Sequence, residues 1–161
     1  MAEHDTTKHK FQNEFRRTVE EAFEWRFAYY IEIMLRFAQY LGRDKLIEMI
    51  KRAVDESNPP NPSPDPDFSL RDWADAGSEA FKDMMTWEVV ESTDAAYEIR
   101  VSECVWTEIF KRHDAADIGY ATVCHSDFCS CKAAHPGITL HRTRTLMQGD
   151  DCCDHRWVFM R

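Results

Sequence analysis

The sequence lacks features that would indicate a membrane protein, a secreted protein or a nucleic-acid-binding protein. No stretch approaches about 20 uninterrupted apolar residues, so we expect no membrane span. The opening decapeptide, MAEHDTTKHK, is polar and has no apolar signal core, which favours a cytoplasmic protein. Basic residues are in the minority, with 20 Lys and Arg against 29 Asp and Glu. The resulting net charge of -9 indicates no nucleic-acid partner.

Cysteine is absent from the first 103 residues, and all six cysteines lie between Cys104 and Cys153. An even number of cysteines suits a disulfide framework in a small secreted chain that has little core. Here a long amphipathic pattern supplies a core and the cytoplasm keeps thiols reduced, so we expect free thiols. The same C-terminal third holds Asp127, His141 and Arg142, so the side chains suited to chemistry are concentrated there.

Apolar residues recur at helical spacing in three stretches of the N-terminal half. The first stretch covers residues 11–41 and is followed by Gly42, which is a natural helix stop. Asp44 is the expected cap of a second helix. A third helix is expected over about residues 70–85, with Ser69 near its N-terminal cap.

The rest of the chain predicts an extended connection followed by a mixture of strands and helices. Residues 58–67 contain five of the six prolines, and proline fixes φ and removes a backbone donor, so this segment reads as a surface connection. Alternating polar and apolar residues predict two strands around a turn within 87–101, and further strands at 138–146 and 153–159. Residues 105–134 return to a helical period interrupted by a loop.

We therefore predict an α+β fold in which N-terminal helices pack on a small antiparallel sheet with an inserted helix. A chain of 161 residues is expected to form a single domain over residues 1–161. Its parts are a helical segment at 1–57, the proline-rich connection at 58–67, and an α+β segment at 68–161 that carries the site.

Two motifs stand out in the C-terminal segment. One is a C-x-x-D motif formed by Cys124 and Asp127, and the other is the stretch GDDCCDHRW at 149–157. Cys104 lies at a predicted strand end, and the run RTRT occupies 142–145. In combination these features resemble the family named for L-2-amino-thiazoline-4-carboxylic acid hydrolase.

The resemblance covers about residues 87–161 and departs from the family pattern at a few positions. His155 stands where an aromatic residue such as Phe is expected, and the thiols of Cys129, Cys131 and Cys152 are additional. The resemblance implies a hydrolase that opens a small cyclic C–N substrate, such as a 2-aminothiazoline carboxylate or a related heterocycle or amide. A more distant similarity to vinyl-reductase-type domains implies the alternative, a small-molecule- or metal-binding domain without turnover.

The residue types themselves are suited to opening an amidine-like ring. A thiolate is a good nucleophile when a nearby cation lowers its pKa, and Cys124 is the first candidate, followed by Cys153. Asp127 lies one helical turn after Cys124, so both side chains are able to face one cavity. The expected role of Asp127 is to act as a general base or to orient His125 or His141, and His141 is therefore also a candidate catalytic residue.

Three arginines are candidates for binding a small-molecule substrate that carries a carboxylate. Arg142, Arg144 and Arg156 each offer a planar guanidinium that forms bidentate hydrogen bonds with a carboxylate. The aromatic-rich helices are also able to pair between subunits, so the sequence is compatible with a homodimer.

A metal site is the competing mechanism. Cys104, Cys124, Asp127 and Cys153 are candidate ligands for zinc or another divalent metal, and His141 offers an imidazole. A metal-bound hydroxide would then carry out the hydrolysis, with Asp127 as a ligand or base. The cysteine spacing follows no zinc-finger pattern, so both routes stay open.

Overall fold

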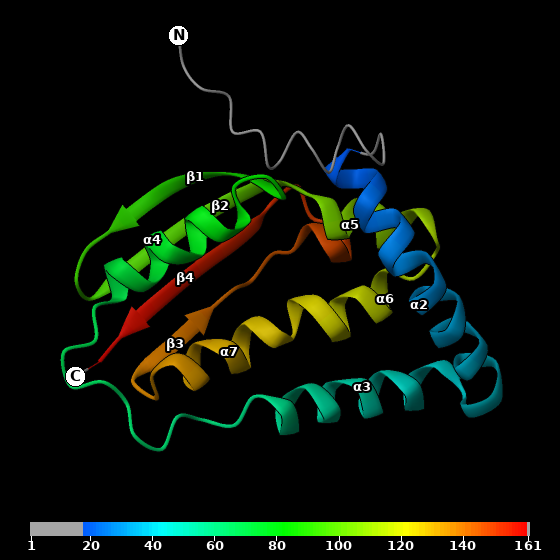
Figure 1. The fold of residues 1–161 in the computed structure, drawn as a ribbon, viewed down its shortest axis with the longest axis horizontal. Helices are drawn as coiled ribbons and strands as arrows, with labels where there is room; N and C mark the ends of the chain where they lie inside the picture. The colour runs from blue at the N-terminus through cyan, green and yellow to red at the C-terminus, as the bar shows by residue number, and fades with distance from the viewer. Residues whose placement is uncertain (1–17, 161) are drawn as a thin grey trace, which may run out of the picture.

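The computed structural model describes residues 18–160, so the first seven residues of the helix predicted over 11–41 lie outside the described part of the chain. Figure 1 shows the order of the elements along the chain. The helices are α2 (Val19–Leu41), α3 (Arg43–Ser57), α4 (Leu70–Phe81), α5 (Val105–Arg112), α6 (Ala116–Gly119) and α7 (Ser126–Ala134). A π-helical turn, η1 (Tyr120–Cys124), joins α6 to α7, and a 3-10 turn, η2 (Leu146–Gln148), precedes the last strand.

The four strands form one antiparallel sheet in the order β1-β2-β4-β3. Their bounds are β1 (Met85–Ser92), β2 (Ala96–Cys104), β3 (Ile138–His141) and β4 (Cys153–Phe159). The register of β1 on β2 shifts between Thr86, which pairs with Glu103, and Trp87, which pairs with Val101. This irregularity leaves Ser102 without a partner in the register. It therefore returns Cys104 to the face that carries Val101, because side chains otherwise alternate along a strand.

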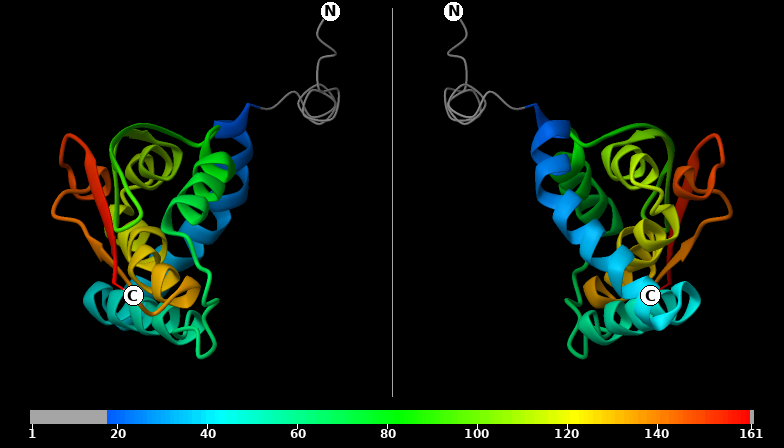
Figure 2. Two further views of the ribbon diagram at one scale, coloured as in Figure 1. Left: turned by 90° about the vertical axis from the view of Figure 1, so that its left-hand side faces the viewer. Right: turned by 90° about the vertical axis from the view of Figure 1, so that its right-hand side faces the viewer.

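The sheet is one layer of the molecule, and the helices lie on one of its faces (Figure 2). Helices α4 and α7 cover this inner face, where the core contains Leu70, Ala74, Tyr97, Ile99, Val101, Cys131, Ile138, Leu140, Cys153 and Phe159. The outer face carries charged side chains in cross-strand pairs such as Arg100 with Glu88, 2.9 Å apart. The fold is therefore α+β, as the sequence predicts.

A second core lies between the N-terminal helices and the helical segment inserted between β2 and β3. It contains Ile31, Leu46, Ile109, Phe110, Ala115, Ile118, Cys124 and Met147. Helices α2 and α3 thus pack mainly on α5, α6 and η1, which refines the expectation that they pack on the sheet itself. Cys124 belongs to this second core and Cys153 to the first, so the segment between them connects the two cores.

Three local expectations are corrected by the structure. Helix α4 ends at Phe81, short of the predicted end near residue 85, because Met85 already begins β1. Gly42 ends α2 with a φ of 85° and directly precedes α3, so Asp44 lies in the first turn of α3 and does not cap it. Strand β3 stops at His141, and the predicted continuation to residue 146 is wrong. The cap at Ser69 is confirmed, since its hydroxyl accepts the Asp72 backbone N–H at 3.2 Å. In the part of the chain described, no helix has the length and apolar character needed to cross a membrane.

Candidate functional site

A π-helical turn places the C-x-x-D motif at the junction of the two cores. The backbone N–H of His125 donates to the carbonyl of Tyr120 at 2.7 Å, five residues back, and such wide turns are rare and often occur at functional sites. Gly119 precedes the turn, and a Cβ there would lie 2.6 Å from the ring of Phe110. The segment therefore packs against α5 with no space for a larger residue. As a result Cys124 is buried, and Asp127 lies half-buried in the first turn of α7.

Arg142 is the arginine of the RTRT run that enters the interior, where its side chain is 2% exposed. Its Nη1 donates to Asp127 Oδ2 at 2.6 Å, and its Nη2 donates to the carbonyl of Cys124 at 2.8 Å. The guanidinium also lies 4.8 Å from the centre of the Phe128 ring and 5.7 Å from that of Tyr120. A buried cation in this position links the C-x-x-D motif to the chain that follows β3.

The loop after β3 is held by carboxylates of the GDDCCDHRW stretch. Asp154 Oδ1 accepts the backbone N–H groups of Thr143 at 2.9 Å and Arg144 at 2.6 Å, and Asp150 Oδ2 accepts that of Thr145 at 2.7 Å. Burial acts to raise the pKa of Asp154, but the hydrogen bonds from Thr143 and Arg144 outweigh it and the pKa is lowered. Because these side chains take the N–H groups that a strand would use, β3 cannot continue beyond His141. Arg142 still points inward, as Ile138 and Leu140 do, whereas Arg144 pairs with Asp151 in the loop.

His155 completes the cluster from the inner face of β4. Its Nε2 lies 3.1 Å from Arg142 Nη1 and 3.4 Å from Asp127 Oδ2, and its ring stacks on Trp157 with centroids 5.3 Å apart. A guanidinium only donates and a carboxylate only accepts, so Nε2 forms a hydrogen bond with one of these two groups at a time. In the tautomer that accepts from Arg142, which is the shorter contact, the ring proton is on Nδ1. Among the described residues, His155 Nδ1 is the buried side-chain nitrogen or oxygen that has no hydrogen-bond partner. A buried polar atom without a partner is rare in folded proteins.

The thiols near this cluster are not activated as nucleophiles in this structure. Burial, the largest effect, raises the pKa of Cys124 to about 12, although Arg142 acts to lower it; Asp127, Cys104 and Cys153 add to the rise. Burial likewise raises the pKa of Cys153, whose sulfur accepts the backbone N–H of Leu146 at 3.2 Å. Both groups are therefore neutral thiols near pH 7.

Cys104 differs from these two thiols because it is partly exposed. It lines a surface hollow of about 310 Å³ at the point where β2 joins α5. Acidic side chains dominate this hollow, with Glu103 and Glu108 beside Cys104. The negative charge of the hollow suits a cationic group, such as a protonated amidine, better than a carboxylate.

Three of the predicted site residues lie away from this cluster. His141 is exposed at the end of β3. Arg144 pairs with Asp151 at 2.9 Å in the loop. Arg156 projects from the outer face of the sheet, where it pairs with Glu91 at 3.0 Å. Only Arg142, of the three candidate arginines, lies beside Asp127 and Cys124.

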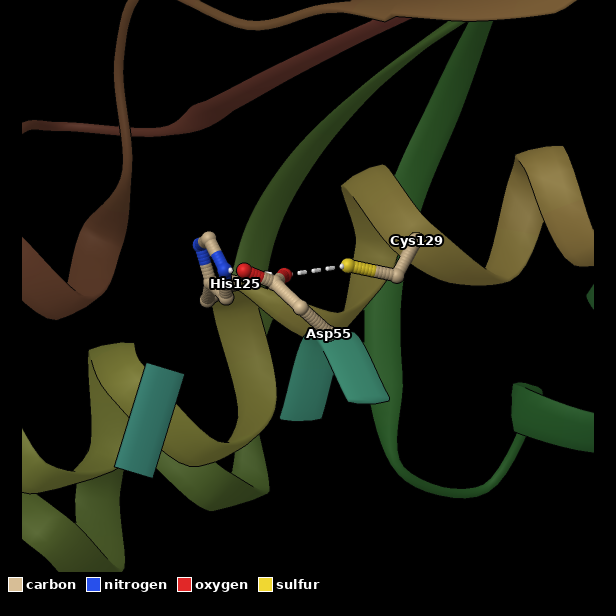
Figure 3. Close-up of side chains that lie close together, drawn as sticks. All are labelled: Asp55, His125 and Cys129. Atoms are coloured by element: carbon tan, nitrogen blue, oxygen red, sulfur yellow. Dashed lines mark hydrogen bonds and ion pairs between the residues drawn. The ribbon is translucent and has the colours of Figure 1, made fainter. Parts of the chain in front are cut away.

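The candidate metal ligands Cys104, Cys124, Asp127 and Cys153 do not converge on one point. Within residues 18–160, the ligand atoms that lie within 4.8 Å of one another belong to a different group, Asp55, His125 and Cys129 (Figure 3). Asp55 lies in α3 and pairs with His125, the residue that follows Cys124. The two residues are far apart in the sequence, so the spacing of residues along the chain does not predict this pair.

His155 is the site residue that the sequence reasoning did not select. The signal was present, because His155 alternates with Cys153 and Trp157 along a predicted strand and stands where an aromatic residue was expected. The stacking of its ring on Trp157 explains how an imidazole takes an aromatic position.

The fold and the site together define a small α+β protein with a buried guanidinium–carboxylate–imidazole cluster between two cores. The sequence model of the family described as L-2-amino-thiazoline-4-carboxylic acid hydrolase matches residues 15–157, so the chain belongs to this family. The match extends beyond the region 87–161 in which the resemblance was expected, and it includes the N-terminal helices. The family takes its name from a hydrolase. No curated protein gives a significant match to the chain.

Proposed function

We propose that this protein hydrolyses a small cyclic C–N substrate, such as a 2-aminothiazoline-type ring or a related heterocycle or amide. The observation that carries the proposal is the half-buried carboxylate of Asp127, held by the buried Arg142 in a chain that belongs to a hydrolase-named family. Carboxylates in such positions serve as general bases toward water.

The geometry around Asp127 supports this role. Its side chain is 37% exposed, whereas those of Arg142 and His155 are 2% and 10% exposed. Both contacts fall on Oδ2, and among the described residues no hydrogen bond reaches Oδ1. Oδ1 is therefore the oxygen that is positioned to accept a proton from water.

The proposed step is an addition of water to the ring carbon followed by ring opening. The water oxygen forms a bond to the amidine or carbonyl carbon while Asp127 Oδ1 takes its proton. The bond between that carbon and its ring heteroatom then breaks, and the heteroatom leaves with the proton from Asp127. The step consumes one water and needs no redox partner. Arg142 keeps the carboxylate in position and offsets the charge that develops nearby.

His155 is proposed to set substrate orientation. Its Nδ1–H is a buried donor without a protein partner, so a ring nitrogen, sulfur or carbonyl of the substrate would accept its hydrogen bond. Since an aromatic residue is expected here in the family, this contact would distinguish the substrate of this chain from those of its relatives.

The test is a screen of 2-aminothiazoline carboxylates and cyclic amides, with the product identified by the mass of one added water. Asp127→Asn is expected to lower kcat/KM by roughly 10²–10⁴-fold, the range typical of a lost general base. Cys124→Ser is expected to retain turnover within about tenfold, because the neutral thiol takes no part in the reaction. Loss of turnover in Cys124→Ser with Asp127→Asn active would instead establish the thiol route.

A further inference from the structure

A second cluster of reactive side chains lies outside the proposed catalytic site, at the contact between α3 and α7. Asp55 stands near the end of α3, whereas His125 directly precedes α7 and Cys129 follows four residues later, within α7. This spacing places the side chains of His125 and Cys129 on one face of the helix. Figure 3 shows the imidazole and the thiol on either side of the Asp55 carboxylate.

One oxygen is the point at which the three side chains meet. Asp55 Oδ1 lies 2.8 Å from His125 Nε2, and the thiol of Cys129 donates to it at 2.9 Å. All three ligand atoms lie within 4.8 Å of one another. A thiol is a weak hydrogen-bond donor, so its hydrogen bond to Asp55 alone does little to explain a cysteine in this position.

The order of the groups argues against a catalytic triad. In a nucleophile–base–acid arrangement the imidazole lies between the thiol and the carboxylate, whereas here the carboxylate lies between the thiol and the imidazole. Burial and the hydrogen bond to Asp55 raise the pKa of Cys129 to about 11, so this thiol is not an activated nucleophile. The set of donors, one sulfur, one imidazole nitrogen and one carboxylate oxygen, is instead typical of zinc ligation.

We propose that Asp55, His125 and Cys129 bind one zinc ion that links α3 to α7 and leaves the fourth coordination position to water. In a tetrahedral site with metal–ligand bonds of about 2.0–2.3 Å, neighbouring ligand atoms lie roughly 3.4–3.6 Å apart. The two separations from Asp55 Oδ1, 2.8 and 2.9 Å, therefore need to open by about 0.6 Å, and the third, between His125 Nε2 and Cys129 Sγ, lies within 4.8 Å and needs to reach the same range. The Asp55 side chain is 56% exposed, so it is free to make this adjustment and the ion is able to enter from solvent.

Zinc binding at this point replaces the shared hydrogen bonds with three metal–ligand bonds. The Cys129 thiol loses its proton to solvent as the Zn–S bond forms, and the ring proton of His125 moves from Nε2 to Nδ1 through solvent so that Nε2 is free to bind the metal. No oxidation or reduction is involved. The ion would fix α7 against α3 on both sides of Asp127, which lies two residues after His125 and two before Cys129, and so would steady the proposed catalytic carboxylate. This role goes beyond the hydrolysis proposed above, and its test does not depend on turnover.

The experiment uses the full chain, prepared reduced, metal-free and without a polyhistidine tag. Cobalt(II) is titrated in, followed by zinc, and the ligand-to-metal charge-transfer absorption of a cobalt–thiolate bond is recorded. The expected result is one equivalent of bound cobalt with this absorption, displaced by one equivalent of zinc. Cys129→Ser is expected to abolish the absorption, and Asp55→Asn and His125→Gln to weaken binding by more than about tenfold.

Matched variants separate this site from other ligands. Glu56→Gln alters an exposed acid next to Asp55, and His141→Gln alters an exposed histidine outside the cluster, so both are expected to bind metal as the parent does. Circular dichroism of each variant verifies that the helices form. Absence of stoichiometric binding by the parent protein would overturn the proposal. So would absorption that survives Cys129→Ser but disappears in Cys124→Ser or Cys153→Ser, which would place the metal in the interior.

Discussion

Replacement of Arg142 by Met tests whether the buried guanidinium holds the two cores together. Met keeps the length and apolar character of the stem but removes both sets of donors. The Asp127 carboxylate then loses its 2.6 Å partner, and the buried carbonyl of Cys124 loses its 2.8 Å donor. The contacts of the guanidinium with Phe128 and Tyr120 disappear as well.

The expected loss in free energy of unfolding is about 2–4 kcal/mol. Removing one member of a buried ion pair costs about 3–5 kcal/mol when the partner remains buried. Asp127 is 37% exposed, so water partly replaces the lost arginine and the Asp127 share is smaller. The unpaired Cys124 carbonyl adds about 1–3 kcal/mol to the loss. In the opposite direction, the Met variant avoids the free-energy cost of removing a charged guanidinium from water on folding, which reduces the loss.

The assay is urea denaturation followed by circular dichroism, with a thermal melt as a second measurement. For a domain of this length, the predicted loss corresponds to a fall in Tm of roughly 5–15 °C. Arg156→Met is the matched control, because Arg156 is 41% exposed on the outer face, where it pairs with Glu91 and Glu98. Its loss should stay below about 1 kcal/mol. Equal losses in the two variants, or a loss below about 1 kcal/mol for Arg142→Met, would refute the structural role of the buried guanidinium.

Three further predictions concern thiols and packing. Because burial raises the pKa of Cys124 to about 12 from an ordinary value of 9.0, the folded chain retains this proton above pH 9 while the unfolded chain loses it. The free energy of unfolding should therefore fall as the pH rises, by up to about 1.4 kcal/mol per pH unit for this thiol. Urea titrations at alkaline pH should show a smaller fall for Cys124→Ala than for the parent protein. An equal fall in both proteins would contradict the burial. Cys104 is partly exposed and Cys131 is 1% exposed, so Cys104 should react with a maleimide first. The folded protein is labelled, digested and analysed by mass spectrometry. The reverse order would rule out the described packing of α7. Gly119→Ala should destabilise the protein by about 1–3 kcal/mol, because the new methyl group would lie 2.6 Å from the Phe110 ring. A thermal melt measures this loss. An unchanged Tm would contradict the tight packing of Gly119 against Phe110.

The local elements could be predicted because their causes are local. The strand at 153–159 matches β4 at both ends, and the helix that follows Ser69 begins where its hydroxyl cap predicts. Alternation along a strand and a 3.6-residue period along a helix both depend on neighbouring residues alone. The end of β3 could not be predicted in this way, because Asp154, some ten residues later, takes the backbone N–H groups of Thr143 and Arg144.

The sequence by itself determined the α+β class, the family and the concentration of chemistry in the C-terminal third, and it placed Asp127 one turn after Cys124. Tertiary structure alone decided which side chains meet. Arg142 continues the inward alternation of Ile138 and Leu140, whereas Arg144 pairs with Asp151 because the strand has ended. Asp55 reaches His125 across 70 positions of the chain. Such meetings depend on how whole elements pack against one another, and no periodicity in a one-dimensional sequence records that packing.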